Sequence, residues 1–269
     1  MGYRAYSPGS VTLFFRIVEN EDPRKMGSLG VGVCVDPGAI TEIKEGEGIF
    51  LNGQKIEGPI QRKVMEMFGF QGQVETTIAL PVSQGFGMSG AIALSTSLAL
   101  ASKFRKTYFE AAEIAHVAEV TMGTGLGDVA SEFEGGFTIR TSPGIQPFGV
   151  VDRIHYGGKI NLFVFGEPIN TREIITNKKF REKIIEEGEY AMRRFMKKRT
   201  FDNALAIARD FSLELGVMSP SLRDFIENCE NSTQALLGNS AIVFGECRDI
   251  PDNAQSFQVS LGSRARILR

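Results

Sequence analysis

Residues 81–102 read PVSQGFGMSGAIALSTSLALAS, and this stretch decides how the 269-residue chain is organised. The β-rich run at 74–80 before it predicts a strand. Pro81 and a set of closely spaced glycines, among them Gly85 and Gly87, then break that run. The sequence therefore predicts a strand that ends in a glycine-rich loop.

Helical spacing begins directly after the loop. Ala91, Leu94, Leu98 and Ala101 recur on one face of a helix, and the cations of KFRK at 103–106 suit its C-terminal end. Backbone N–H groups at a helix N-terminus favour an anion, and glycines let a phosphate approach the backbone closely. The pattern therefore predicts an anion-binding loop. Its spacing matches neither the P-loop nor the dinucleotide fingerprint, and a glycine turn before a core helix remains an open alternative.

Composition and charge limit the class of protein. The chain is 42% hydrophobic and 23% charged, which predicts a globular fold with a substantial core in one large or two modest domains. A formal net charge of −2 argues against a nucleic-acid partner. No apolar run approaches the roughly 20 residues that span a bilayer, and the N-terminus does not resemble a signal peptide, so we expect no membrane partner and a cytoplasmic location.

The cysteine and histidine content also fits a cytoplasmic protein without a zinc site. Cys34, Cys229 and Cys247 show no CxxC pairing, so we expect no disulfide framework, as in a reducing cytosol. The chain has two histidines, which argues against a histidine-rich zinc site.

The first sixty residues read as β structure. Residues 4–15, RAYSPGSVTLFF, predict two β segments joined by a turn at 7–10. Glycines around Ser28 precede a strand at 31–35 and would let a ligand approach, so Ser28 is a candidate substrate contact, although a plain turn is an equally open interpretation. Asn52-Gly53 predicts a hairpin, and residues 59–69 predict a short helix.

A second group of polar residues follows the central helix. A helix predicted at 108–121 carries His116 and Glu119 three residues apart, on one face. The loop GTGLGD then leads to Asp128, and Gly135-Gly136 follows. A lone helical histidine is more often a packing residue and a lone glutamate more often a solvated one, so their candidacy depends on the loop.

The pattern changes near residue 151. Residues 159–166 predict a buried strand, 171–199 predict one or two charged amphipathic helices, and apolar positions at 201–215 predict another helix. A further helix is predicted from Pro220, then a helix at 232–238 and a strand at 241–245. We therefore expect two domains, 1–150 and 151–269, with the second closing over a cleft.

Taken in order, these motifs resemble those of the GHMP kinases. The loop pattern of that family, P-x-x-x-G-L-G-S-S-A, stands here as P-V-S-Q-G-F-G-M-S-G-A, with Ser89 matching the second serine. The family's S-G-[IL]-D stands here as T-G-L-G-D, with Gly127 inserted before Asp128. Ser10 replaces a frequent lysine or arginine, and the third motif is degenerate at 235–240. Over residues 4–150 the segments resemble archaeal pantoate kinases in particular.

The resemblance implies a fold and a set of roles. The implied fold is the α+β, two-domain GHMP kinase fold, with an N-terminal ATP-binding α+β domain and a ferredoxin-like C-terminal α+β domain. The implied cofactors are ATP and Mg²⁺, with Ser89 and Glu119 as oxygen ligands of the metal and Asp128 as the catalytic residue. The implied ATP-binding residues are Pro81, Gly85, Gly87, Met88, Ser89, Gly90 and Ala91.

The resemblance also implies the acceptor. Pantoate kinases phosphorylate the terminal hydroxyl of (R)-pantoate to 4-phosphopantoate on the archaeal route to coenzyme A. Arg140 would then pair with the pantoate carboxylate, while His116, Ser28 and Thr171 would bind its other polar groups. A homodimer is expected by analogy. Other GHMP acceptors (shikimate, homoserine, mevalonate) and a non-catalytic ligand sensor of the same fold remain open, as does a surface ion pair for Arg140.

Overall fold

The structure is a computed structural model that describes residues 2–168, 177–248, 250–251 and 254–268, and the expected α+β class is confirmed. The strands are β1 (Tyr3–Val18), β2 (Gly27–Lys44), β3 (Gly48–Leu51), β4 (Gln54–Ile56), β5 (Gln73–Ile78), β6 (Phe137–Ser142), β7 (Val150–Ile154), β8 (Ile160–Val164), β9 (Ser232–Gln234), β10 (Ser240–Phe244), β11 (Gln255–Leu261) and β12 (Arg266–Leu268). The helices are α1 (Pro59–Phe68), α2 (Met88–Phe104), α3 (Tyr108–Met122), α4 (Asp128–Glu134), α6 (Lys178–Lys197), α7 (Phe201–Leu215) and α8 (Pro220–Asn228).

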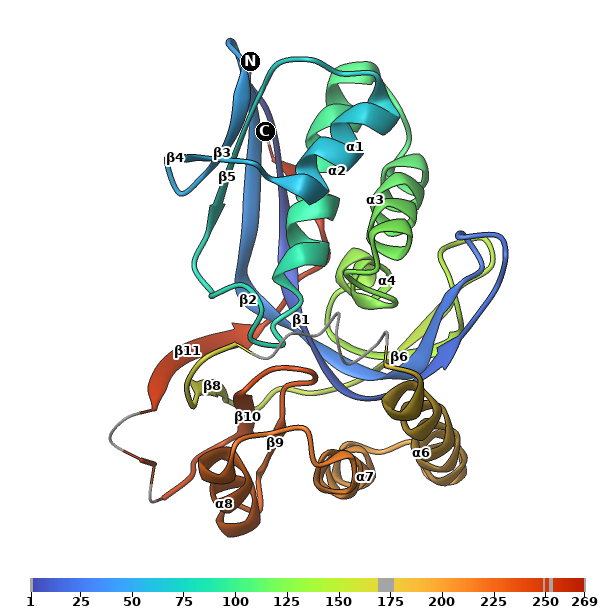
Figure 1. Ribbon diagram of the computed structural model, residues 1–269, viewed down its shortest axis with the longest axis vertical. Coiled ribbons are helices and arrows are strands. Elements are labelled where there is room, and N and C mark those ends of the chain that lie inside the picture. The colour runs from blue at the N-terminus through green and yellow to red at the C-terminus, as the bar shows by residue number, and fades with distance from the viewer. Residues whose placement is uncertain (1, 169–176, 249, 252–253, 269) are drawn as a thin grey trace.

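One path of hydrogen-bonded strands joins the two halves of the molecule in Figure 1, in the order β4-β3-β5-β2-β11-β8-β10-β9. The crossing point is β11, which pairs with β2 of the upper half and with β8 of the lower half. The last strand, β12, pairs with β1, so that Ala5 lies opposite Ile267 and both termini lie at the top of Figure 1. The C-terminal segment therefore contributes strands to both halves.

Helix α2 runs through the core of the upper half. The sequence predicts one apolar face, but every residue from 90 to 101 is buried. The reason is that α2 packs against β1 and β2 on one side and against α1, α3 and α4 on the others. Its small polar residues fit this setting because they find buried partners: Ser95 bonds Thr41 (2.8 Å) and Ser97 bonds the Ala111 carbonyl (2.7 Å).

The long hairpin of β1 and β2 differs from the sequence prediction. Residues 7–10 form no turn, because β1 is continuous and pairs with β2 along its whole length. The pairing slips between Ser7 and Gly9 and again between Thr12 and Phe14. Such bulges bend a strand and redirect its side chains, and these two flank Ser10 and Thr12. The proline and glycine therefore mark a bulge rather than a reversal.

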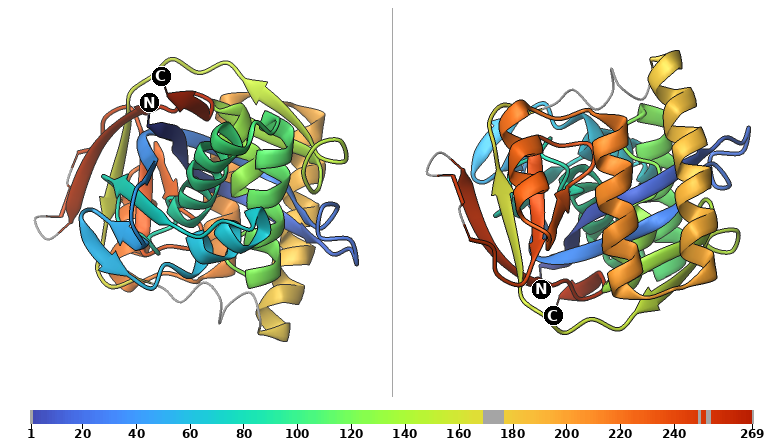
Figure 2. Two further views of the ribbon diagram at one scale, coloured as in Figure 1. Left: turned by 90° about the horizontal axis from the view of Figure 1, so that it is seen from above. Right: turned by 90° about the horizontal axis from the view of Figure 1, so that it is seen from below.

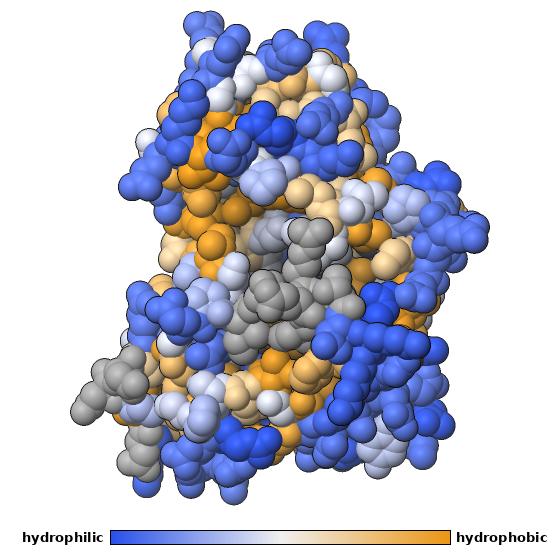
Figure 3. Space-filling view, in the orientation of Figure 1, coloured by the Kyte–Doolittle hydropathy of each residue, from blue (hydrophilic) through white to orange (hydrophobic). Residues whose placement is uncertain are grey.

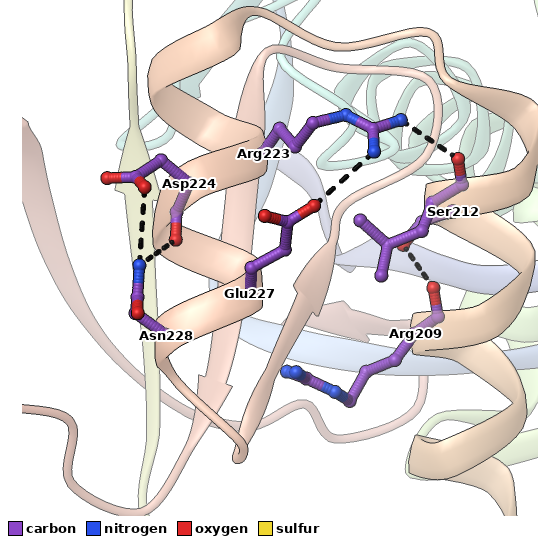
Figure 4. Close-up of polar contacts among 7 residues, drawn as sticks. Arg209, Ser212, Arg223, Asp224, Glu227 and Asn228 are labelled. Carbon is purple, nitrogen blue, oxygen red and sulfur yellow. Dashed lines mark hydrogen bonds and ion pairs between the residues drawn. The ribbon is translucent and has the colours of Figure 1, made fainter.

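The lower half consists of β8–β11 with α6, α7 and α8. Helices α6 and α7 pack against β1, as the view from below in Figure 2 shows. Helix α8 covers β8 and β10 through an apolar cluster that includes Phe163 and Phe225. Its polar side is tied to α7 where Arg223 donates to the Leu213 carbonyl (3.1 Å) (Figure 4). Residues 232–234, predicted as the start of a helix, instead form β9, because they pair with β10.

The cysteines also correct an expectation. The structure joins Cys229 to Cys247 in a disulfide whose Cα atoms are 6.0 Å apart, and Cys34 is free and buried. The two bonded residues are 18 positions apart and carry no spacing motif, so only the fold brings them together. Within the described ranges, no helix combines the length and the apolar character that a membrane crossing requires.

Candidate active site

Four elements meet at the middle of the molecule. The first turn of α2, the end of α3, the first turn of α4 and the bulged part of β1 lie side by side there. The space-filling view shows this face hollowed between the upper and lower halves (Figure 3). Polar side chains from all four elements meet at this point.

The glycine-rich loop leads into an uncapped helix end. Gly85 and Gly87 have φ of 77° and 63°, and Gly87 is the N-cap of α2. As a glycine, Gly87 has no side chain to cap this end, and the first turn holds no acidic residue. The Ala91 N–H already bonds the Gly87 carbonyl (3.0 Å), so the amides of the three residues before Ala91 remain for an anion. The predicted anion-binding loop is therefore present as a geometry.

Two neighbours hold this loop in place. On one side the Ser10 N–H donates to the Phe86 carbonyl (2.9 Å), which fixes the loop against β1. On the other side, Gln84 Nε2 donates to the Gly166 carbonyl (2.9 Å) and the Ser240 hydroxyl donates to the Gln84 carbonyl. The segment at 235–240, the degenerate third motif, thus packs on the phosphate loop although its glycine pattern is absent.

Ser89 and Glu119 are brought together as the sequence predicts. Ser89 Oγ donates a 2.6 Å hydrogen bond to Glu119 Oε1, and Thr124 Oγ1 donates a 2.7 Å bond to the same oxygen. Glu119 is 2% exposed, and its Oε2 has no hydrogen-bond partner among the described residues. Burial raises the pKa of Glu119 to about 7, and the neighbouring Asp128 charge adds to the effect. The orphan oxygen is therefore available to a cation.

Asp128 opens α4 beside this pair. Its Oδ1 accepts from Thr12 Oγ1 (3.5 Å), and the residue as a whole is half-buried. Burial raises its pKa above the usual value, while Arg140 and the hydroxyls of Ser10 and Thr12 lower it. Ser10 Oγ has no hydrogen-bond partner among the described residues, so its effect on Asp128 is that of a nearby dipole. Ser10 therefore faces the site even though it carries no charge.

A small pocket opens next to Asp128. It is lined by Thr12, Ser28 and the loop from Thr124 to Asp128, and Leu236 and Leu237 close it from the lower half. Arg140 lies directly behind this loop: a Cβ on Gly127 would come within 2.6 Å of its Nε. The inserted Gly127 therefore lets Arg140 and Ser28 approach the loop backbone.

Arg140 is buried rather than paired on the surface. It is 2% exposed, and its Nε has no hydrogen-bond partner in the described part of the chain. Across the described ranges it forms no ion pair. The surface ion pair that was the alternative for Arg140 is therefore wrong for these residues. Buried charges normally have partners, and the Asp128 carboxylate is the charge that favours the protonated form of this guanidinium by raising its pKa, against the effect of burial.

The other predicted contacts are placed differently. His116 is buried, and its Nε2 lies 3.0 Å from the Met26 carbonyl oxygen. That nitrogen therefore already has a backbone hydrogen-bond partner. Burial lowers the pKa of His116, which favours the neutral ring. The side chain of Met88 is buried in the core, so its backbone is what can meet a phosphate. Thr171 lies outside the described residues.

Glu132 is a residue that the sequence analysis missed. It lies one helical turn after Asp128, and its carboxylate would come within 3.0 Å of a Cβ on Gly90. Glu132 is fully buried, and neither carboxylate oxygen has a hydrogen-bond partner among the described residues. Burial, together with the charges of Asp128 and Glu119, raises the pKa of Glu132 well above the usual range. Its position four residues after Asp128, on the same helix face, is the sequence feature that could have identified it. Ser131 and Thr124 were also missed.

Among the described residues, no three His, Cys, Asp or Glu side chains gather to hold a metal. A serine and one glutamate are nevertheless enough for Mg²⁺ beside a nucleotide, because this ion keeps waters and takes phosphate oxygens as ligands. The orphaned Glu119 Oε2 fits such an ion.

Comparison with known proteins adds to this geometry. Residues 56–136 match the model of the GHMP kinases N terminal domain. The chain is 33% identical over 262 residues to the pantoate kinase of Methanocaldococcus jannaschii, covering 92% of this chain and 94% of that protein. It is 32% identical to the pantoate kinase of Thermococcus kodakarensis, covering 91% and 88%.

Solved structures agree. A "phosphotransferase related to CoA biosynthesis pathway" superposes with a TM-score of 0.86 at 28% identity, covering 100% of this chain and 99% of that one. Mevalonate-3-kinase of Thermoplasma acidophilum superposes with a TM-score of 0.66 at 14% identity, covering 99% and 98%, which shows the shared fold alone.

Proposed function

Because this chain belongs to the pantoate kinases of the GHMP kinase family, we propose that it transfers the γ-phosphoryl group of ATP to the terminal hydroxyl of pantoate, giving 4-phosphopantoate for coenzyme A synthesis. The observation that carries the proposal is the buried Arg140, which forms no ion pair with any described residue and lies behind Gly127 of the pocket at Asp128. A cation there suits an acceptor with a carboxylate at one end and a hydroxyl at the other.

The phosphate donor occupies the loop before α2. The free amides of Met88, Ser89 and Gly90 bind the phosphates, and the helix dipole favours their charge. Ser89 and Glu119 would hold Mg²⁺, which would supply positive charge to the phosphate oxygens. Glu119, whose pKa is about 7, would be held in its ionised form beside such a cation.

The acceptor occupies the pocket at Asp128. Asp128 orients the attacking hydroxyl and accepts its proton, while Arg140 and Ser28 bind the carboxylate end. The charge of Arg140 lowers the pKa of Asp128 and so helps to keep it ionised despite its burial. Because the transition state of phosphoryl transfer is loose, these positions matter more than the basicity of Asp128.

The test is ADP release with Mg·ATP and a panel of acceptors: pantoate, shikimate, homoserine and mevalonate. We expect release with pantoate alone, and ³¹P NMR of the product should show a phosphomonoester on a primary carbon. Release with another acceptor and none with pantoate contradicts the substrate. No release with any acceptor, while ATP still binds, supports a ligand sensor instead.

Three further properties are part of the proposal. Residues 1–150 form the ATP-binding domain and 151–269 the covering domain, which returns β12 to β1. The family resemblance supports a cytoplasmic enzyme and a homodimer. Sedimentation equilibrium tests the dimer, and a monomer at micromolar concentration contradicts it.

A further inference from the structure

Strand β6 places two polar side chains on one face. Thr138 and Arg140 are two residues apart, and alternate residues of a strand point to the same side. Register with β2 sets Thr138 opposite Gly32 and Arg140 opposite Gly30, so no side chain of β2 stands between them and their neighbours. Helix α4 packs on this strand and presents Ser131.

Ser131 holds one end of the guanidinium. Arg140 Nη1 donates a 2.6 Å hydrogen bond to Ser131 Oγ, and Thr138 Oγ1 donates a 3.1 Å bond to the same oxygen. All three side chains are buried, at 0% exposure for Ser131 and Thr138 and 2% for Arg140. The three groups therefore form one dry hydrogen-bonded chain from β6 to α4 and back.

The Nε atom of the Arg140 guanidinium lies on the side of Gly127. Arg140 Nε has no partner among the described residues and lies beside Gly127, at the point where the Ser28 hydroxyl also approaches. Arginine offers a planar fork of donors, so fixing Nη1 also fixes the direction of the Nε–H bond. Ser131 thus determines which edge of Arg140 lies against Gly127, a residue that lines the pocket.

We propose that Ser131, supported by Thr138, is a positioning residue that presents the Nε edge of Arg140 to the carboxylate of the acceptor and so sets the preference for an acidic acceptor. This inference rests on the proposed function. An arginine held in its bound conformation loses less conformational freedom when the acceptor binds, so the acceptor binds more tightly. The Ser131 hydroxyl bonds Arg140 and Thr138 rather than the nucleotide loop, so turnover at saturation should not depend on it.

The experiment compares Ser131→Ala with wild type in steady-state kinetics. A hydrogen bond to a charged group has an effect of about tenfold or more, so we expect KM for pantoate to rise by that factor. KM for ATP and kcat should stay within about twofold, as for an interaction made equally in ground and transition states. With pantoamide, in which the carboxylate is an uncharged amide, kcat/KM should fall far less than with pantoate.

A double variant and a control variant distinguish a positioning role of Ser131 from a purely structural one. In Arg140→Ala, which removes the group that Ser131 orients, adding Ser131→Ala should change KM by less than about twofold, because the two residues act as one unit. Ser212→Ala is the matched control: Ser212 is also a fully buried helical serine, with its hydroxyl on the Arg209 carbonyl (3.1 Å), and it lies in α7 (Figure 4). It should leave KM for pantoate unchanged.

The outcomes are distinguishable. If Arg140→Ala raises KM for pantoate and Ser131→Ala does not, the positioning role is wrong and the proposed function stands. If neither raises it, the acceptor contact itself is wrong. If Ser131→Ala does not fold, Thr138→Val should raise KM for pantoate, whereas Thr138→Ser, which keeps the hydroxyl, should have the wild-type KM. If Thr138→Val leaves KM for pantoate unchanged, or if Thr138→Ser raises it equally, the positioning role is wrong.

Discussion

Gly85 of the phosphate loop and Gly238 of the lower half lie backbone against backbone. A Cβ on Gly238 would collide with the Gln84 carbonyl, and a Cβ on Gly85 would lie 3.0 Å from the Gly238 nitrogen. The contact fits together with the hydrogen bonds that Gln84 makes to Gly166 and receives from Ser240. The geometry of the phosphate loop therefore depends on a segment about 150 residues later in the chain.

Gly238→Ala should disturb the phosphate loop. The added methyl meets backbone, which cannot move aside as a flexible side chain would, so we expect a loss of about 1–3 kcal/mol in the free energy of unfolding. KM for ATP should rise more than KM for pantoate. Urea denaturation and steady-state kinetics measure the two effects.

The matched control is Gly157→Ala, because a Cβ there meets nothing within 4 Å. It should leave stability and KM for ATP as in wild type. Equal behaviour of the two variants would show that the Gly85–Gly238 contact has no role in nucleotide binding.

Asp128→Asn should retain the fold and ATP affinity but lose turnover. Removal of a general acid or base typically lowers the rate by about 10²–10⁴, and we expect kcat to fall in that range. Because burial raises the pKa of Asp128, wild-type kcat should also fall as pH decreases, beginning above the usual carboxyl range. Near-wild-type kcat in the variant would remove Asp128 from the mechanism.

Ser89→Ala and Glu119→Gln should each raise the Mg²⁺ concentration that gives half-maximal activity. Both side chains are proposed oxygen ligands, and Glu119 keeps one oxygen free in the structure. Titration of activity with Mg²⁺ at saturating ATP measures the shift. Ser97→Ala in the same helix is the control, since its hydroxyl bonds the Ala111 carbonyl. Loss of activity with unchanged Mg²⁺ dependence would indicate packing rather than metal binding.

Glu132→Gln should make the free enzyme more stable than wild type as pH rises. The folded-state pKa of Glu132 is well above its unfolded value of 4.5, so the folded protein keeps a proton that the unfolded chain loses. Stability of the wild type therefore falls with increasing pH above about 4.5, by about 1.4 kcal/mol per pH unit from this group, until the folded pKa is reached.

Urea denaturation of both proteins between pH 5 and 8 measures the difference. Glu57→Gln is the control for an exposed position, since the Glu57 side chain is 96% exposed. A difference between Glu132→Gln and wild type that does not grow with pH would mean that Glu132 is ionised in the folded state.

Much of this protein follows from short-range patterns in its sequence. The order of strand, glycine loop and helix at 74–104, the hairpin at Asn52-Gly53 and the helix that carries Glu119 are all confirmed. These features depend on residues within a few positions of one another: glycines that allow positive φ, apolar residues at helical spacing, and caps. The motif order was also enough to indicate the family.

Other features were decided only by tertiary packing. Pro8 and Gly9, between the serines at 7 and 10, predict a turn, but pairing with β2 over the whole of β1 makes the segment a bulge. Residues 232–234 form a strand because β10 lies beside them, and Cys229 meets Cys247 only in the folded chain.

The site shows the same division. The sequence alone pointed to four candidate residues, because their types and their order along the chain match the motifs of the family: Ser89, Glu119, Asp128 and Arg140. It contained no sign that Ser131 would hold Arg140, because that contact joins a helix to a strand across a dry interface. Hydrogen bonds of this kind depend on distance and burial between elements, which no local periodicity encodes, and so the direction of the Arg140 guanidinium was decided by the tertiary structure.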